Sequence, residues 1–483
     1  MNPYFSILIV LIYLGLILWV SYFSSRQSGS ADFYRGGNKS PWWVVAFGMI
    51  GTTLSGVTFI SVPGWVSSPA KMSYFAVILG NFIGYLFIAQ VLLPLYYRRN
   101  LTSIYTFLEE RFGFRAYKTS AALFLLSKAI GASFRLFIVT LVLQITIFSP
   151  LHVPYAVNAF FCVAVIWAYT FKGGIKAIVW TDLVQTFFLI FAVVFTIFSI
   201  QQALGFSFPE MLKQIGQSPQ FLIFDFENPL SNPNHFLKQF TAGIFIAIVM
   251  TGLDQDMMQK NLSLKNIREA KKNFLTFSIV SIPVCFIFMC LGVLFFIYMQ
   301  QTGIPIPAKT DNIYPMIATQ YLPAVTGILF MLGVIAAAFS SANSALIAMT
   351  TSFTVDLYGV KGKTENEKKK IRFYTHIGCA LLLASVMIAF SSFNNESVVY
   401  AIFKFAGYTY GPLLGLFFVG ILLKTEVRDQ SIPFVAVLSI ALTISIDHYS
   451  SILLNGYRFG FEILLLNGAL TTMGLLLCRK NKK

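Results

Sequence analysis

The sequence predicts an all-α membrane protein that crosses the bilayer about 13 times. Three observations predict this class. Hydrophobic residues make up 57% of the 483 residues and charged residues only 11%, whereas charged residues reach about 25% in soluble domains. Apolar runs near the roughly 20 residues that a spanning helix needs recur along the whole chain. Between these runs, lysine and arginine gather in every second loop.

The apolar runs are numbered one to thirteen in chain order. They begin near Pro3, Trp42, Tyr74, Ser120, Val153, Ile178, Phe240, Phe274, Pro323, Thr375, Val398, Ile432 and Phe461. No basic region precedes the first run and no small-residue cleavage pattern follows it, so we expect a retained helix rather than a signal peptide. Because the number of runs is odd, the two termini are expected on opposite sides of the membrane.

Basic residues predict the orientation. One cluster between runs seven and eight consists of Lys260, Lys265, Arg268, Lys271 and Lys272. An excess of lysine and arginine marks the cytoplasmic side. The N-terminus is therefore expected outside and the C-terminus in the cytoplasm, in a multi-pass protein of the cell (inner) membrane. The net charge of +16 then follows from topology, and no nucleic-acid partner is expected.

The residues that usually carry catalysis form no catalytic pattern. The five cysteines are scattered through apolar runs without metal-ligand spacing, and the four histidines are widely separated. They predict neither a disulfide framework nor a zinc site. We therefore expect that the chain is not an enzyme and needs no cofactor.

The second run is interrupted by polar and small residues. Its stretch Gly51-Thr-Thr-Leu-Ser-Gly-Val-Thr-Phe-Ile-Ser-Val-Pro-Gly64 carries glycines, a proline, hydroxyl side chains and no charge. Backbone groups freed by a broken helix are tolerated in a membrane only where they border protein or a polar cavity. We expect a break that coordinates a ligand; close helix packing through small residues is the alternative.

A polar stripe marks the ninth run. Ala337, Ser340, Ser341 and Ser344 share one helical face because they lie at i, i+3, i+4 and i+7. Hydroxyl and carbonyl oxygens are hard ligands that suit a small hard cation, which favours sodium without excluding potassium. Serine-mediated helix packing is the alternative.

Five ionisable side chains inside the runs are candidates for a functional role. They are Lys128 and Arg135 in run four, Asp182 in run six, Asp254 in run seven and Lys404 in run eleven. Such groups are costly in a membrane and usually face a partner or a transport path. Lys128 is expected to snorkel to the cytoplasmic surface. Asp182 either coordinates a cation or accepts a proton, and Asp254 either binds solute or neutralises Arg135 or Lys404.

Several motifs occur in a fixed order on these runs. They are Ser55-Gly56 with Pro63-Gly64, Leu93-Pro-Leu-Tyr96 before Leu108-Glu-Glu-Arg-Phe112, Gly173-Gly-Ile-Lys-Ala177 before Trp180-Thr-Asp-Leu-Val-Gln185, and Ser340-Ser341 before Asp356-Leu-Tyr358. With these motifs, nearly the whole chain resembles the sodium:solute symporter family, which includes sodium/glucose cotransporters and bacterial proline and sialic acid symporters.

The resemblance implies a LeuT-like five-plus-five inverted repeat whose first helices, runs two and seven, are broken at the substrate level. Residues 42–204 would form the first repeat (core helices one to five) and residues 240–424 the second (core helices six to ten). Residues 1–41 would add an N-terminal helix and a cytoplasmic loop, 205–239 an extracellular loop, and 425–483 two C-terminal helices and a cytoplasmic tail.

The resemblance also implies binding residues. The principal sodium ligands would be Gly51, Leu54, Ala337, Ser340 and Ser341. A second sodium site, present in some members, would use Asp182, Ser344 and Asn343, although Asn343 replaces a serine and puts the second ion in doubt. The candidate substrate-binding residues are Ser55, Thr58, Asn81, Arg135, Asp254 and Lys404.

The substrate positions depart from those of sugar transporters. Lys404 stands where those members carry a glutamine, and Asp254 where they carry an asparagine, so a simple hexose site is not expected. Arg135 resembles an arginine of sialic-acid or proline-type members. Two cations facing a cavity favour an anionic or carboxylated solute, and this inference weakens if Asp254 neutralises one of them.

The predicted function is sodium-coupled import of a small polar organic solute by alternating access, by a protein that functions as a monomer in the lipid bilayer. A proton-coupled symporter of the same fold, using Asp182 or Asp254 as the proton carrier, is the alternative. A second alternative is a solute sensor that does not transport.

Overall fold

The computed structural model describes residues 3–25, 40–99, 101, 103–171, 174–360, 362–393, 398–423 and 425–480. Throughout these ranges the elements are helices, and an isolated bridge between Val427 and Arg479 is the only extended pairing. The all-α class predicted from composition is therefore confirmed. The loop that was expected to follow the first helix lies at residues 26–39, outside the described residues.

The N-terminal half of the chain contains ten α-helices, several of them extended by π-helical turns, within the described ranges. Their bounds are α1 Pro3–Ser25, α3 Trp42–Thr53, α4 Gly56–Val66, α5 Tyr74–Phe87, α6 Leu93–Arg98, α7 Thr106–Arg111, α8 Phe114–Leu143, α9 Tyr155–Thr170, α10 Gly174–Ala203 and α11 Phe208–Gln217. The π-helical segment Ile88–Leu92 joins α5 to α6, and Gln144–Phe148 extends α8.

The C-terminal half has the same construction. Its helices are α12 Phe236–Ala247, α13 Gln255–Asn261, α14 Ile267–Thr302, α15 Ile313–Met316, α16 Ala324–Ser352, α17 Glu365–Phe393, α18 Val398–Phe418, α19 Ile432–Leu453 and α20 Ile463–Leu477. The π-helical segments Ile248–Gly252, Ile317–Tyr321, Phe353–Tyr358 and Val419–Leu423 follow α12, α15, α16 and α18.

Nine helices in the described part of the chain are long and apolar enough to cross a membrane, or eleven if each of two bent pairs is one span. The shorter apolar helices α9 and α20 coincide with the two remaining predicted runs. Some helices begin before the run that predicted them; α8 starts at Phe114 rather than near Ser120. A helix satisfies its backbone internally, so it continues past the hydrocarbon into the charged region where hydropathy no longer detects it.

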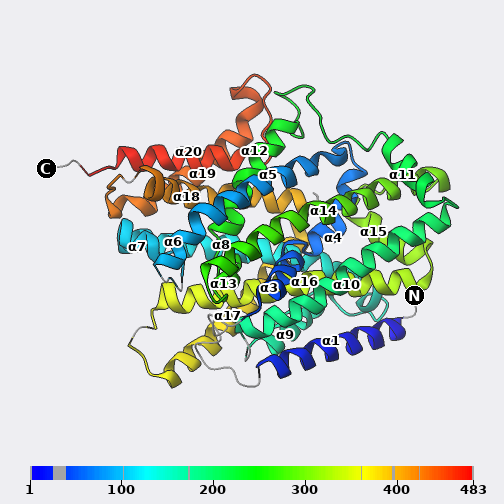
Figure 1. Cartoon of the computed structure of the whole chain (residues 1–483), viewed down its shortest axis with the longest axis horizontal. Coiled ribbons are helices and arrows are strands. Elements are labelled where there is room, and N and C mark those ends of the chain that lie inside the picture. Colours follow the sequence, from blue (N-terminus) through cyan, green and yellow to red (C-terminus); the bar gives the residue numbers. More distant parts are fainter. Residues whose placement is uncertain are drawn as a thin grey trace.

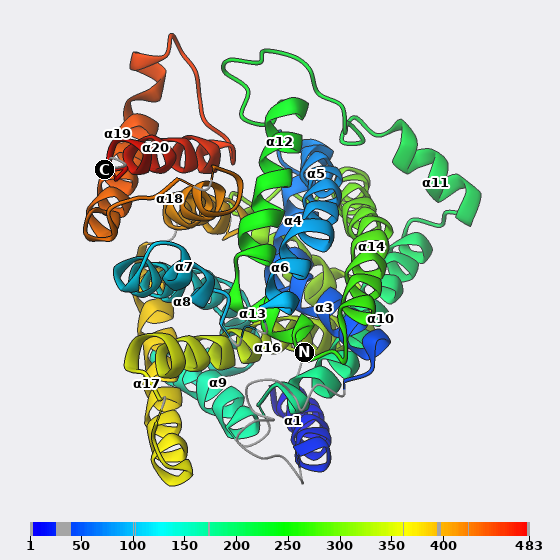
Figure 2. The same ribbon diagram turned by 60° about the vertical axis from the view of Figure 1, so that its left-hand side comes forward.

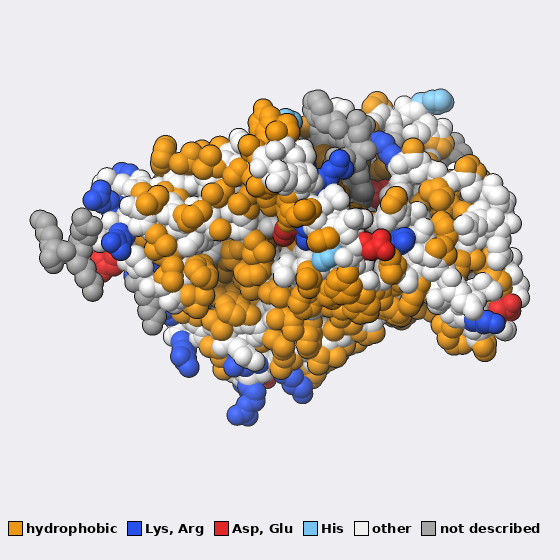
Figure 3. Space-filling view, turned by 90° about the horizontal axis from the view of Figure 1, so that it is seen from above, with side chains coloured by type: hydrophobic (Ala, Val, Ile, Leu, Met, Phe, Trp, Pro, Cys, Tyr) orange, Lys and Arg blue, Asp and Glu red, His pale blue; other side chains and the backbone are white. Residues whose placement is uncertain are grey.

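The helices form a layered bundle with α1 along one side and α19 and α20 along the opposite side (Figure 1, Figure 2). Hydrophobic side chains gather over the middle of the face in view in Figure 3. On the peripheral helices, Ile12 and Trp19 of α1 and Phe434 and Val437 of α19 are 64%, 59%, 69% and 69% exposed. Apolar surface on this scale is expected where helices contact lipid.

Two spans are broken, as predicted. Helices α3 and α4 meet at 52°, and the segment Phe236–Gly252 meets α13 at 66°. At the first break, Ser55 adopts ψ 172° instead of a helical value. At the second, Asp254 is extended (φ −106°, ψ 121°), and its carboxylate caps α13 by accepting from the backbone N–H of Asp256. This cap satisfies one of the donors that a new helix start leaves unpaired.

Tyrosines satisfy the carbonyls that the second break frees. The Tyr96 hydroxyl donates to the Gly252 carbonyl at 2.9 Å, and the Tyr105 hydroxyl donates to the Leu253 carbonyl at 3.0 Å. Both tyrosines are fully buried. The surrounding bundle therefore stabilises the break, since the polar backbone groups at the break have hydrogen-bond partners away from lipid.

Glycines bring four helices into close contact. A Cβ placed on Gly243 of α12 would lie 2.2 Å from the Val77 carbonyl oxygen of α5, and one on Gly80 of α5 would lie 2.0 Å from the Phe240 carbonyl oxygen. A Cβ on Gly292 of α14 would lie 2.5 Å from the carbonyl oxygen of Pro63 in α4. Only glycine permits such approaches, which is the usual role of small residues between membrane helices.

Gly243→Ala is expected to destabilise the protein by about 1–3 kcal/mol or more, because the added methyl meets backbone that cannot rotate away. The measurement is the thermal unfolding midpoint of the purified protein. Gly378→Ala in α17 is the matched control, since nothing lies within 4 Å of its Cβ position. Equal midpoints for both variants would show that α5 and α12 are less tightly packed than described.

Candidate functional site

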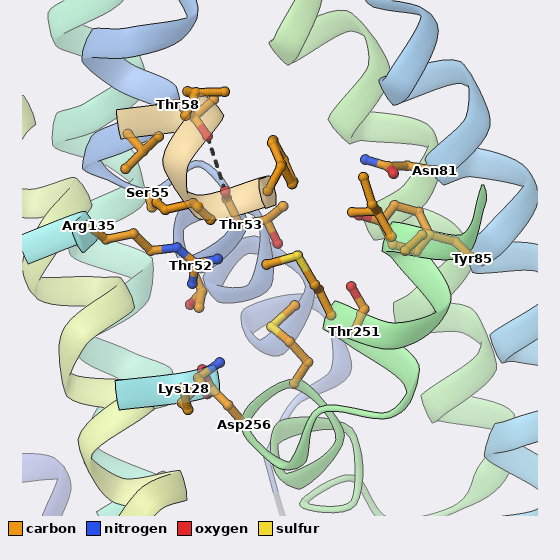
Figure 4. Close-up of a pocket in the computed structure, with 18 of the residues that line it drawn as sticks. Thr52, Thr53, Ser55, Thr58, Asn81, Tyr85, Lys128, Arg135, Thr251 and Asp256 are labelled. Atoms are coloured by element: carbon orange, nitrogen blue, oxygen red, sulfur yellow. Dashed lines mark hydrogen bonds and ion pairs between the residues drawn. The ribbon is translucent and has the colours of Figure 1, made fainter. Parts of the chain in front are cut away.

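A polar pocket of about 90 Å³ lies beside both breaks (Figure 4). Helices α3, α4, α5, α8 and α12 contribute to its wall, as do α13 and α18. Its lining residues with polar groups are Thr52, Thr53, Ser55, Thr58, Tyr74, Asn81, Tyr85, Lys128, Arg135, Thr251 and Asp256. Four of the six predicted substrate residues, namely Ser55, Thr58, Asn81 and Arg135, therefore lie together.

Arg135 reaches into this pocket from α8 toward the break in the second span, and Asn81 lines the opposite side from α5 (Figure 4). The Arg135 guanidinium makes no ion pair or side-chain hydrogen bond within the described residues. The side-chain oxygen of Asn81 is buried and also lacks a partner there. A buried polar atom without a partner, such as the Asn81 oxygen, costs free energy, so this oxygen and the Arg135 cation are suited to a polar ligand.

Lys128 does not snorkel, which corrects the expectation from sequence. Its side chain is 6% exposed, and its ammonium lies 3.1 Å from Asp254 and 2.7 Å from Asp256. The ammonium is 3.1 Å from both Asp254 oxygens, and the Tyr410 hydroxyl donates to one of them, Oδ2, at 2.6 Å. Asp254 thus neutralises Lys128 rather than Arg135 or Lys404. It lines a small adjoining cavity that Lys128 and Arg135 share with the main pocket.

Lys404 lies outside the pocket, so the expectation that it faces solute is also corrected. Its ammonium is 3.3 Å from Asp447 of α19 and its side chain is 35% exposed. Lys404 therefore joins α18 to the peripheral α19. Arg135 is left as the pocket cation without a carboxylate partner among the described residues.

Asp182 of α10 is fully buried beside the first break. One carboxylate oxygen accepts from the Ser340 hydroxyl of α16 at 2.8 Å, and the other accepts from Thr52 of α3 at 3.2 Å. The Thr52 and Ser340 hydroxyl oxygens are 3.4 Å apart. The structure thus brings Ser340 of the principal sodium set and Asp182 of the second set into direct contact.

Lys260 completes this cluster, and sequence reasoning misplaced it. It was counted in a cytoplasmic basic loop, yet its side chain is 1% exposed and its ammonium lies 2.7 Å from Asp182. It also donates to the Thr52 hydroxyl. The length of the span could have predicted this position. If the span breaks near Asp254, its inner half must continue past Lys260 to reach the membrane surface.

The residues of the principal sodium set suit the ion. All five predicted ligands (Gly51, Leu54, Ala337, Ser340 and Ser341) are buried. The Ser341 hydroxyl donates to the Ala338 carbonyl at 3.0 Å, which leaves its oxygen lone pairs free. The start of α4 lies against α16, since a Cβ on Gly56 would be 3.5 Å from the Ala338 Cβ. The first break and the part of α16 that carries Ser340 and Ser341 therefore pack against each other.

The residues of the second sodium set suit a cation less well. Asn343 and Ser344 are buried, and their side-chain polar atoms lack hydrogen-bond partners in the described chain. The one carboxylate of the set, Asp182, is already neutralised by Lys260. Oxygen ligands for a second ion are present here, but the negative charge of Asp182 that would bind it is already paired with Lys260.

Comparison with known proteins gives consistent matches. The model of the sodium:solute symporter family matches residues 33–427. A sodium/sialic acid symporter, NanT of Aliivibrio fischeri, is 28% identical and covers 85% of this chain and 82% of its own length. A sodium/glucose cotransporter of Vibrio parahaemolyticus is 25% identical and covers 91% and 84%.

A solved structure of a Na⁺-coupled sialic acid symporter, in a substrate-bound outward-open state, has a TM-score of 0.83 at 21% identity and covers 99% of both chains. This likeness confirms the predicted LeuT-like fold. The family model covers most of the chain. The chain therefore belongs to the sodium:solute symporter family and is a sodium-coupled membrane transporter rather than an enzyme.

Proposed function

We propose that this protein imports a small organic solute that carries a carboxylate together with hydroxyl or amino groups. The single observation that carries the proposal is the Arg135 guanidinium, which faces the pocket without an ion pair within the described residues. An arginine pairs with a carboxylate through two parallel, charge-assisted hydrogen bonds. Lys128, by contrast, already faces Asp254 and Asp256.

The remaining lining supports donor groups on the solute. The Asn81 side-chain oxygen and one Asp256 carboxylate oxygen lack hydrogen-bond donors in the described chain, while the other Asp256 oxygen lies 2.7 Å from the Lys128 ammonium. A hydroxyl or amino group on the solute would supply them. One relative is named for sialic acid, which is an acidic solute, and another is named for glucose, which is a neutral sugar.

Sodium would couple to this pocket through the first break. An ion held by the Gly51 and Leu54 carbonyls and by Ala337, Ser340 and Ser341 would tie α3 and α4 to α16. Ser55, one residue past Leu54, lines the pocket. Binding of either ligand then orders the break for the other, and the coupling is reciprocal. We further propose that the protein acts as a monomer with its N-terminus outside and its C-terminus in the cytoplasm.

The test is a thermal-stability screen of the purified protein against a library of sugar acids, amino acids, monocarboxylates and neutral sugars, in sodium and in potassium. A carboxylate that raises the unfolding midpoint only in sodium is the expected result, because a ligand that binds the folded state stabilises it. Stabilisation by neutral sugars alone would overturn the proposal. The amide of the best carboxylate is the matched control ligand.

A further inference from the structure

The cluster beside the first break contains a cation that belongs to the chain itself. The Lys260 ammonium, on α13, lies 2.7 Å from Asp182 of α10 and donates to Thr52 of α3. The Lys260 and Asp182 side chains are 1% and 0% exposed. Three helices, including the inner halves of both broken spans, therefore meet around one buried positive charge.

We propose that the Lys260 ammonium takes the place of a second sodium ion, so that the transporter binds one sodium where Asp182 would otherwise hold a further one. The inference rests on the proposed sodium coupling at the first break. Asp182 carries a single negative charge, and Lys260 balances it. A second sodium would add an uncompensated charge to a buried site, which is strongly unfavourable.

The oxygen ligands for a second ion remain nearby. Asn343 and Ser344 follow Ser340 on α16, and their side-chain atoms are buried without partners in the described chain. The site therefore has neutral oxygen ligands but lacks an unpaired carboxylate. Substituting Lys260 by a neutral side chain would release Asp182 and complete the site.

The principal sodium site does not need the Asp182 charge. Ser340 donates its proton to Asp182, so its oxygen lone pairs are free to face a cation on the other side. The other predicted ligands of that site are neutral oxygens of Gly51, Leu54, Ala337 and Ser341. Lys260 therefore replaces the second ion while the first keeps its ligands.

The experiment counts sodium ions bound to the full-length protein, purified in detergent, by equilibrium binding of ²²Na⁺ in a choline background. The wild type is expected to bind one ion per chain. Lys260→Gln is expected to bind one ion more, with the Hill coefficient of sodium-dependent thermal stabilisation rising from about 1 toward 2. Lys260→Arg keeps the charge and is expected to match the wild type.

A double variant separates charge from structure. Lys260→Gln with Asp182→Asn removes both charges and is expected to bind the same number of ions as the wild type. Two ions on the wild type, or a folded Lys260→Gln that binds no extra ion, would overturn the proposal. If Lys260→Gln does not fold, Lys260→Met takes its place in the ion count.

Failure of the proposed sodium coupling can be distinguished from failure of the proposal for Lys260. A wild type that binds no sodium and takes up solute without it would refute sodium coupling at the first break. In that case an ion gained by Lys260→Gln would still support the role of Lys260, and none gained would refute it.

Discussion

Lys128→Met is expected to lower the free energy of unfolding by about 3–5 kcal/mol, because the variant leaves Asp254 and Asp256 as neighbouring buried carboxylates without a cation. All three side chains are at most 6% exposed, so water does little to screen the loss. The measurement is denaturant or thermal unfolding of the purified protein in detergent, without solute.

Two controls separate charge from packing. Adding Asp254→Asn and Asp256→Asn to Lys128→Met removes the unpaired charges, and Asn at 254 keeps an oxygen to cap α13; this variant should recover most of the lost stability. Lys404→Met breaks the more exposed pair with Asp447 and should cost no more than about 1 kcal/mol. Equal losses for Lys128→Met and Lys404→Met would refute the buried network.

Arg135→Gln is expected to raise the dissociation constant of the carboxylate found in the screen by roughly 10- to 100-fold, the loss of one charge-assisted contact worth about 1.5–3 kcal/mol. Solute binding is measured by titration in saturating sodium. Sodium binding, measured without solute, is expected to change little, because the Arg135 side chain is not among the predicted sodium ligands.

The controls for Arg135 vary charge and geometry separately. Arg135→Lys keeps the charge but loses the paired donors, so its affinity is expected between wild type and Arg135→Gln. The amide of the same solute should bind both wild type and Arg135→Gln weakly and alike. If Arg135→Gln weakens the amide as much as the carboxylate, the arginine supports the pocket rather than recognising the acid.

The fold was predictable because the bilayer imposes strong local rules. Each predicted apolar run coincides with a helix, nine to eleven of which are long enough to span a membrane in the described chain, and the polar stretch from Gly51 to Gly64 located the first break from its composition alone. The family followed from motifs in fixed order, and the match to residues 33–427 confirms it. Helix ends were less predictable, because helices such as α8 continue beyond the hydrocarbon.

The partners of the buried charges were not predictable, because ion pairs in a bundle depend on how helices distant in sequence pack. Lys128 and Asp254 are 126 residues apart, and Asp182 and Lys260 are 78 apart. The position of a residue along a span predicts its depth in the membrane, but it does not identify the residue that packs against it. Lys260 was misassigned for a second reason. The count of basic residues placed it in a cytoplasmic loop, whereas it lies in α13, the inner half of a broken span, and is buried there.

The glycine contacts described for α4, α5, α12 and α14 also have a mechanical meaning. Backbone packed against backbone leaves no side-chain layer that can shear, so α5 cannot slide along α12, nor α14 along α4. Both broken spans are thereby clamped to a continuous neighbour. Each pair is therefore expected to move as a unit during alternating access, with the bending placed outside these glycine contacts.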